Sequence, residues 1–150
     1  MISDLNPDEI ILQTQYWTVE LSYKQVYLGR CVVILNRQVD DLGKLSVEEQ
    51  LDFFNVVQKL QNACKITFGA TNFNWTCLMN DAYKSTPPKP WVHWHFRPRY
   101  KDQLVFDGIK FNDPNFGSHY DKNLEKEKPN VDFSPEFRKK IILEIQKYLD

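Results

Sequence analysis

The sequence predicts an α+β domain built around an antiparallel sheet. Three observations carry this prediction: β-branched and aromatic residues gather in four short runs, a long amphipathic segment separates the second run from the third, and a shorter amphipathic segment closes the chain. This order of strand, strand, long helix, strand, strand, helix favours an antiparallel sheet over alternating βα units. The chain is long enough for one domain with a core, so residues 1–150 are predicted to form a single domain.

The first two runs and the long helix occupy the first half of the chain. Residues 9–21 alternate loosely and predict one or two strands, while residues 27–35 (YLGRCVVIL) form a continuous apolar run typical of an inner strand. Residues 46–68 predict the clearest helix, because a Ser-x-x-Glu capping box opens it and Gly69 ends it.

The second half begins with an alternating run at residues 72–79, which predicts a strand. Residues 80–90 form a basic loop stiffened by three prolines. Beyond residue 100 the patterns weaken: residues 106–121 are rich in Gly, Asp, Asn and Pro and predict a structured loop, and residues 123–130 predict a charged linker. The extension over residues 101–150 ends in a helix that Ser134 caps, and its apolar face predicts docking on the core: Phe137, Ile141, Ile145 and Leu149.

Composition excludes several classes of protein. The net charge is −1, so no basic field indicates nucleic-acid binding. The N-terminus is acidic where a signal peptide needs a basic start, and no apolar run reaches membrane-spanning length, so we expect a cytoplasmic protein with no membrane partner. Three widely spaced cysteines are expected to be buried, reduced thiols.

The chemistry concentrates in residues 91–99, which read WVHWHFRPR. Because alternate side chains of a strand point the same way, one face is expected to carry Trp91, His93, His95, Arg97 and Arg99. Two imidazoles and two guanidiniums are not expected in a hydrophobic core, because burying unpaired charge costs free energy. They suit a phosphate, because arginine supplies fixed positive charge and imidazole supplies a nucleophile or a hydrogen-bond donor.

The run HWHFRPR, with Asn80 thirteen residues before its first histidine, resembles the histidine triad (HIT) superfamily of nucleotide hydrolases and transferases. That family's motif is His-x-His-x-His, two apolar residues and often Pro-Arg, which aligns His95 with the third histidine, His93 with the second and Trp91 with the first. The likeness covers about residues 15–100. It implies an antiparallel sheet of about five strands, one long central helix, a C-terminal helix and a homodimer with a continuous sheet.

The resemblance also implies a chemistry. His93 would attack the α-phosphorus of a dinucleoside polyphosphate or nucleoside phosphoramidate and form a nucleotidyl-histidine, while His95 and Asn80 would donate hydrogen bonds to phosphoryl oxygens. No cofactor is required, although a divalent cation is compatible with a polyphosphate substrate. The residues expected to contact substrate are Arg30, Arg97, Arg99, Trp91, Ser22, Lys89 and Ser85. Residues 101–133 are expected to cover the dimer or the mouth of the site.

Two positions depart from the family. Trp91 replaces the first histidine, and an indole cannot take up or relay a proton. Arg30 stands where many members have a further histidine, and arginine stays protonated. The nucleophile is intact, but the speed of the reaction or its leaving group is affected.

Other interpretations remain open. The histidines could be ordinary polar residues of a strand, or a His-x-His metal pair with His119 or Asp121 as third ligand. A nucleotide-binding module with little turnover is the alternative function. The base pocket is less defined. Its candidates are apolar side chains for which packing in the core is the more frequent role: Trp17, Leu28, Val33 and Leu35.

Overall fold

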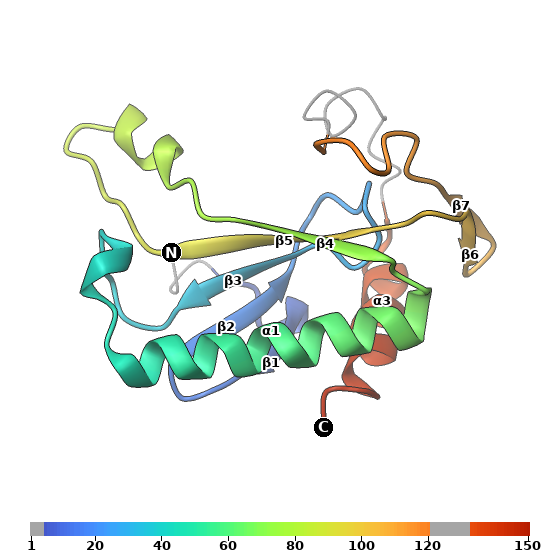
Figure 1. Cartoon of the computed structure of the whole chain (residues 1–150), viewed down its shortest axis with the longest axis horizontal. Helices are drawn as coiled ribbons and strands as arrows, with labels where there is room; N and C mark the ends of the chain where they lie inside the picture. The colour runs from blue at the N-terminus through green and yellow to red at the C-terminus, as the bar shows by residue number, and fades with distance from the viewer. Residues whose placement is uncertain (1–4, 121–132) are drawn as a thin grey trace.

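A computed structural model describes residues 5–120 and 133–150. Its main element is one five-stranded antiparallel sheet in the order β1-β2-β3-β5-β4, so the predicted fold class is confirmed (Figure 1). The central strand β3 is the continuous apolar run that predicted an inner strand. The strands are β1 (Ile10–Gln13), β2 (Trp17–Leu21), β3 (Cys31–Leu35), β4 (Asn72–Thr76) and β5 (His93–Arg99).

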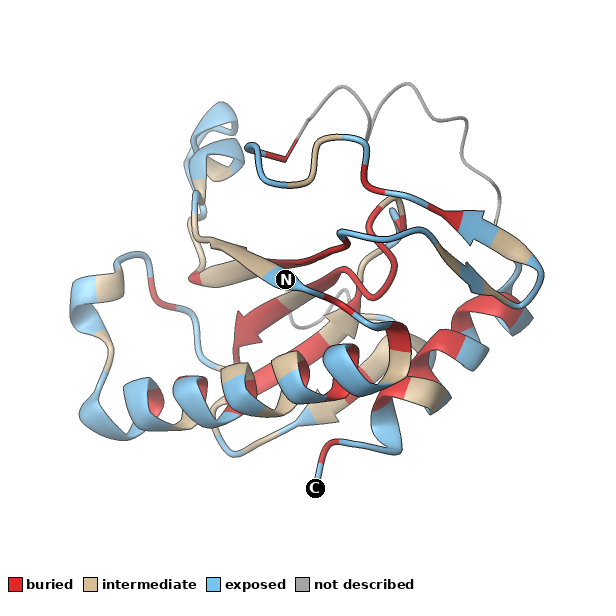
Figure 2. Cartoon of the chain, turned by 45° about the vertical axis from the view of Figure 1, so that its right-hand side comes forward, coloured by how far each residue is buried: buried red, intermediate tan, exposed pale blue. Residues whose placement is uncertain are grey.

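The long helix α1 (Val47–Phe68) covers one face of the sheet. Its predicted capping box is present, because the Ser46 hydroxyl accepts from the Glu49 N–H and the Glu49 carboxylate accepts from the Ser46 N–H. Gly69 ends the helix at φ 72°, a backbone conformation that a side chain would strain. The inner side of α1 is buried against the sheet (Figure 2). There the centroid of the Phe53 ring lies 5.0 Å from that of Trp94.

The C-terminal helix α3 (Pro135–Gln146) docks on the core, as its apolar face predicted. Ser134 caps it through the Phe137 N–H, and all four residues of the predicted face are buried. The helix contacts α1 and β1, and the Gln146 side-chain amide donates to the Ile11 carbonyl at 3.0 Å. Three short 3-10 helices complete the helical elements of the described chain: η2 (Pro7–Glu9), η3 (Leu42–Lys44) and η4 (Asn80–Lys84).

The extension contains structure that the sequence did not predict. Strands β6 (Leu104–Phe106) and β7 (Ile109–Phe111) form a separate hairpin, so the expected loop over residues 106–121 is wrong at its start. Asp107 and Gly108 make the turn with positive φ, which is the preferred chemistry of a two-residue hairpin. Three-residue strands are too short to show alternation. The predicted linker at residues 123–130 lies outside the described residues.

The described chain contains three free cysteines and no membrane-spanning helix. Cys31 and Cys64 are buried free thiols, as predicted, whereas the free thiol of Cys77 is only half-buried. Within residues 5–120 and 133–150, none of the helices has the length and apolar character needed to cross a bilayer.

Candidate active site

The two faces of β5 carry different chemistry. Trp94 and Phe96 lie on the face that α1 covers. The Trp94 ring stacks on Phe53 of α1, and the centroid of the Phe96 ring lies 4.6 Å from that of Trp75 on β4. His93 and His95 therefore lie on the opposite face, which α1 leaves uncovered. Strand register places the neighbours of the histidines on this face: Ile34 beside His93, and Val32 and Thr76 on either side of His95.

His93 is held by a backbone carbonyl. Its Nδ1 lies 2.8 Å from the carbonyl oxygen of Trp91. A carbonyl oxygen only accepts, so Nδ1 carries the proton and donates, and Nε2 of the neutral ring keeps its lone pair. The ring of His95 stands nearly perpendicular to it, with 5.1 Å between centroids. The fold thus selects the tautomer in which Nε2 carries the free lone pair.

Trp91 lies just before β5. Its indole Nε1 donates to the Leu35 carbonyl at 2.7 Å, a bond that ties the entry of β5 to the end of β3. Because an indole has a single donor and no acceptor, Trp91 can offer a substrate only its ring surface.

His95 is uncharged at neutral pH. Burial lowers its pKa to about 3, and the positive charges around it act in the same direction. Its Nδ1 is buried and has no hydrogen-bond partner among the described residues. The charges that contribute, in decreasing order, are those of His93, Arg97 and Arg30, which lower the pKa, and Asp81, which raises it.

We expect the burial of neutral His95 to make stability depend on pH. An unfolded chain binds a proton at this histidine near pH 6.5, whereas the folded chain does not until about pH 3. Over that window the unfolded state holds more protons, so stability falls as pH is lowered from 6.5 towards 3. Urea unfolding of the native chain and of His95→Gln at pH 7 and pH 4.5 measures this contribution. The variant should lose less stability on acidification, and an equal loss would contradict the assignment.

Arg97 and Arg99 are buried, at 4% and 2% exposed, although a charged face was expected to be poor material for a core. The extension supplies the partners that the sequence did not reveal. Arg99 Nε and Nη2 donate to the Asp113 carboxylate at 2.5 and 3.0 Å. Its other N–H groups donate to Asn74 Oδ1 and to the carbonyls of Asn115 and Ser118. Every N–H group of Arg99 is therefore taken inside the chain, and Arg99 is not available to a phosphate.

Arg97 lies nearer the histidines. Its guanidinium stacks on the Tyr120 ring at 4.0 Å, and Nη1 donates to the Thr76 hydroxyl at 3.3 Å. Its charge acts on His95, as does that of Arg30, which is also buried. Two fixed positive charges therefore stand beside His95.

The loop residues are less closely associated with the histidines. Asn80 is exposed at the start of η4, and the charge of its neighbour Asp81 reaches His95. The sequence did not single out Asp81. Ser85 donates its hydroxyl to the Ala82 carbonyl, and Lys89 is exposed at a pocket of about 400 Å³. Among the described residues, no contact is seen between these three predicted side chains and the histidines.

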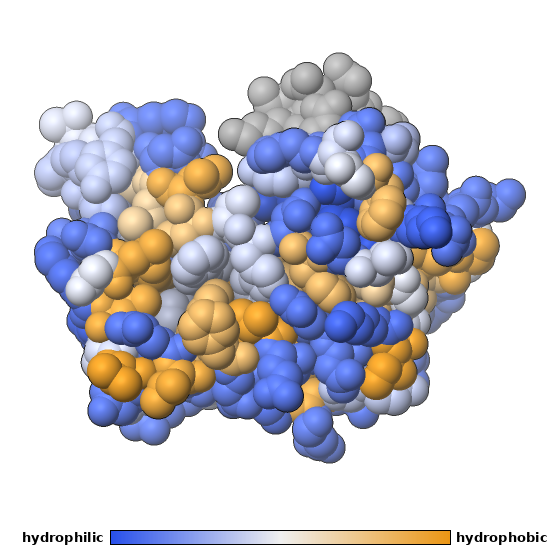
Figure 3. Space-filling model, viewed as in Figure 1, coloured by the Kyte–Doolittle hydropathy of each residue, from blue (hydrophilic) through white to orange (hydrophobic). Residues whose placement is uncertain are grey.

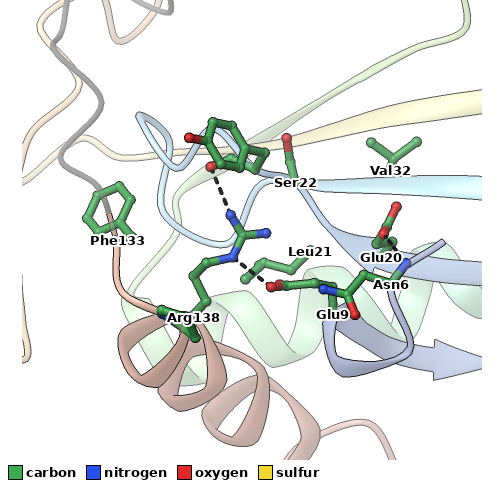
Figure 4. A pocket seen from close by; sticks show the side chains of 10 residues that line it. Asn6, Glu9, Glu20, Leu21, Ser22, Val32, Phe133 and Arg138 are labelled. Carbon is green, nitrogen blue, oxygen red and sulfur yellow. Dashed lines mark hydrogen bonds and ion pairs between the residues drawn. The ribbon is translucent and has the colours of Figure 1, made fainter. Parts of the chain in front are cut away.

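Ser22 lies in a pocket of about 480 Å³ on the same face of the sheet (Figure 4). Glu20 and Val32 line it from the sheet, and Val32 is the neighbour of His95. From the far side Arg138 donates to Glu9 at 2.8 Å. The residues named as alternative members of a base pocket are instead wholly buried in the core: Trp17, Leu28, Val33 and Leu35.

Within the described ranges, no group of three or more His, Cys, Asp or Glu side chains could hold a metal ion. His119 is exposed, with its Nδ1 2.8 Å from the Tyr120 carbonyl. Asp121, the other predicted ligand, lies outside the described residues.

A five-stranded antiparallel sheet crossed by one long helix, with a His-x-His strand on the open face, defines a histidine triad protein. The HIT domain model matches residues 4–102, and the chain belongs to this family. It is 27% identical over 117 residues to the asymmetrical bis(5'-nucleosyl)-tetraphosphatase of Schizosaccharomyces pombe, a match that covers 75% of this chain but 63% of that protein.

Solved structures show the same fold. A histidine triad protein from Marinobacter aquaeolei has a TM-score of 0.64 at 16% identity, covering 99% of this chain and 90% of that one. Plasmodium falciparum diadenosine triphosphate hydrolase has a TM-score of 0.60 at 16% identity, covering 97% and 78%. The C. elegans NitFhit protein has a TM-score of 0.62 at 21% identity. The match covers 96% of this chain but only 28% of that protein's chain. At these identities the likeness shows the fold alone.

Proposed function

We propose that this chain is a nucleotide hydrolase or nucleotidyl transferase that acts at the α-phosphate of dinucleoside polyphosphates or nucleoside phosphoramidates. One observation supports it above the others: the Trp91 carbonyl fixes the His93 proton on Nδ1 and leaves the Nε2 lone pair available. Family membership and the S. pombe tetraphosphatase relative support the substrate class.

In the proposed reaction, His93 Nε2 attacks the α-phosphorus and forms an N–P bond as the bond to the leaving group breaks. The leaving group departs with the electron pair of that bond. A water oxygen, or another acceptor, then attacks the same phosphorus, the N–P bond breaks, and its electron pair returns to Nε2. The proton of the attacking water passes to solvent, and the nucleoside monophosphate is released.

The charge that develops on the phosphoryl oxygens would be stabilised by groups on the same face. His95, uncharged, would donate a hydrogen bond from Nε2, and Asn80, exposed at the start of η4, would donate from its amide. Arg97 and Arg30 supply fixed positive charge beside His95. Ser85 and Lys89 would contact the more distant phosphates.

The nucleoside would extend from His95 across Val32 into the pocket that Ser22 and Glu20 line. One strand, β3, lies between His95 and Glu20, so two strand spacings, about 10 Å across the sheet, separate them, which suits a nucleoside attached to its phosphate. Carboxylates commonly accept hydrogen bonds from ribose hydroxyls, so Glu20 and Ser22 are the proposed ribose contacts.

The test is a covalent adduct. Brief mixing of the native chain with diadenosine tetraphosphate, quenched at a pH where phosphoramidate bonds survive, should add the mass of one adenylyl group to the intact protein. Fragmentation should place that mass on the peptide with His93. The matched control is His119→Ala, which removes an exposed imidazole elsewhere and should still form the adduct.

Absence of an adduct, together with saturable nucleotide binding and no product, would favour the alternative of a nucleotide-binding module. An adduct on His95 or His119 would contradict the assignment of the nucleophile.

We also propose a homodimer that forms along β4. This strand is an edge of the sheet, so one side of its backbone can pair with a second copy. Beside it, α1 exposes an apolar stripe at helical spacing, Val47, Leu51 and Phe54, each 65–67% exposed; hydrophobic side chains gather over this half of α1 (Figure 3).

Sedimentation equilibrium should give about twice the 17.9 kDa chain mass, and Phe54→Asp should shift it towards one chain mass. Leu143→Asp is the matched control, because Leu143 is an exposed apolar residue on α3. A mass of one chain for the native protein at working concentration would contradict the proposed homodimer.

A further inference from the structure

Two substrate classes fit the proposed reaction, and they differ in the leaving group. A phosphate chain leaves the α-phosphorus as a stable anion and needs no proton. An amine leaves a phosphoramidate only if its nitrogen gains a proton, because an amide anion is far too basic to depart, and enzymes supply that proton from a general acid. The proton donors around His93 therefore decide which class the site can process.

The two residues that depart from the family cannot act as that acid. The only N–H group of the Trp91 side chain is held by the Leu35 carbonyl at 2.7 Å, and an indole does not titrate. Arg30 is buried beside His95 and keeps its proton at every physiological pH.

His95 is a hydrogen-bond donor rather than an acid. Two guanidiniums lie near it: strand register sets Arg97 two residues further along the same face, and Arg30, directly before β3, lies opposite Arg97. Buried in that positive setting it stays neutral at pH 7. Giving up its remaining proton would create an imidazolate, so it cannot protonate an amine.

Among the described residues, Cys77 and Asp81 are the further titratable groups that interact with the two histidines directly. Burial raises the pKa of the Cys77 thiol, an effect that the His93 backbone N–H partly opposes, so the thiol holds its proton. Asp81 pairs with Lys84, and its side chain is 83% exposed, so it is ionised at neutral pH. Among the described side chains around His93, none can therefore act as a general acid at pH 7.

We propose that the site selects substrates by leaving group: it cleaves phosphoanhydrides, whose leaving groups depart as anions, and processes amine-leaving phosphoramidates poorly. This inference rests on the proposed function and chooses between its two substrate classes. We assign the selectivity to Trp91, because its carbonyl holds the His93 ring while its side chain has no proton to give.

The experiment compares two substrates that transfer the same adenylyl group. For the native chain at pH 7, kcat/KM should be at least about 100-fold higher for diadenosine tetraphosphate than for adenosine 5'-phosphoramidate, since a general acid is worth about 10²–10⁴ in rate. In Trp91→His that ratio should fall at least roughly 10-fold, because the new imidazole can protonate the amine. In Trp91→Phe, which changes the ring but adds no acid, the ratio should stay as in the native chain.

The outcomes separate this inference from the function on which it rests. Equal kcat/KM values for both substrates, or faster cleavage of the phosphoramidate, would overturn the leaving-group selectivity and leave the nucleotidyl-transfer reaction standing. No turnover of either substrate would overturn the proposed function itself. The comparison on the native chain decides the inference even if a Trp91 variant fails to fold.

Discussion

Replacing Asp113 by alanine is expected to lower the free energy of unfolding by about 3–5 kcal/mol, because it leaves the Arg99 guanidinium charged and unpaired in the core. For a domain of this size that corresponds to a fall in Tm of roughly 6–20 °C. Urea and thermal unfolding monitored by far-UV circular dichroism would measure both quantities.

The control for this variant is Asp40→Ala, which breaks the exposed ion pair with Lys44 and should leave the free energy of unfolding nearly unchanged. The double variant Arg99→Met/Asp113→Leu should be more stable than Asp113→Ala, because it removes both charges. If Asp113→Ala and Asp40→Ala were equally stable, the buried pair would not hold the extension.

The second large effect is expected from His93→Ala. Without an imidazole the N–P bond cannot form, so kcat for diadenosine tetraphosphate should fall by about 10³-fold or more, as for other enzymes that lose their nucleophile. Affinity for the product nucleotide should change by no more than about threefold, because the other groups on the face remain. Steady-state kinetics and equilibrium titration with AMP measure the two quantities separately.

His119→Ala serves again as control and should keep the native kcat. A hydrolysis rate left unchanged by His93→Ala would show that another group attacks the phosphorus, and both the covalent step and the leaving-group selectivity would need a new nucleophile.

The elements that were predicted correctly are those whose causes are local. The capping box of Ser46 and Glu49 and the left-handed Gly69 fix the ends of α1 within a few residues, and Ser134 does the same for α3. Alternation along β5 is equally local, and it put both histidines on one face. The hairpin β6–β7 was missed because its strands are too short to alternate, although its Asp-Gly turn was a usable signal.

The parts of the site that could not be predicted depend on contacts distant in sequence. Nothing in the strand shows that Arg99 meets Asp113 and that Arg97 meets Tyr120, since these partners lie in a segment with no periodic pattern. The proton on His93 Nδ1 is set by a backbone carbonyl, which any residue at position 91 would supply. The Ser22 pocket needs the N-terminal turn and α3 to meet over β2.

The pairing of Arg99 with Asp113 ties the reactive strand to a segment beyond the HIT domain match, which ends at residue 102. A fragment trimmed to residues 4–102 would keep both histidines and Arg99 but lose Asp113, Tyr120 and α3. The guanidinium would then have to reach solvent or admit water to the interior, and the β4–β5 ladder, in which Arg99 pairs with Asn72, would have to distort. We therefore expect a chain cut at residue 102 to be less stable than the full chain, and a chimaera that grafts this histidine strand into a relative to need Asp113 and Tyr120 as well.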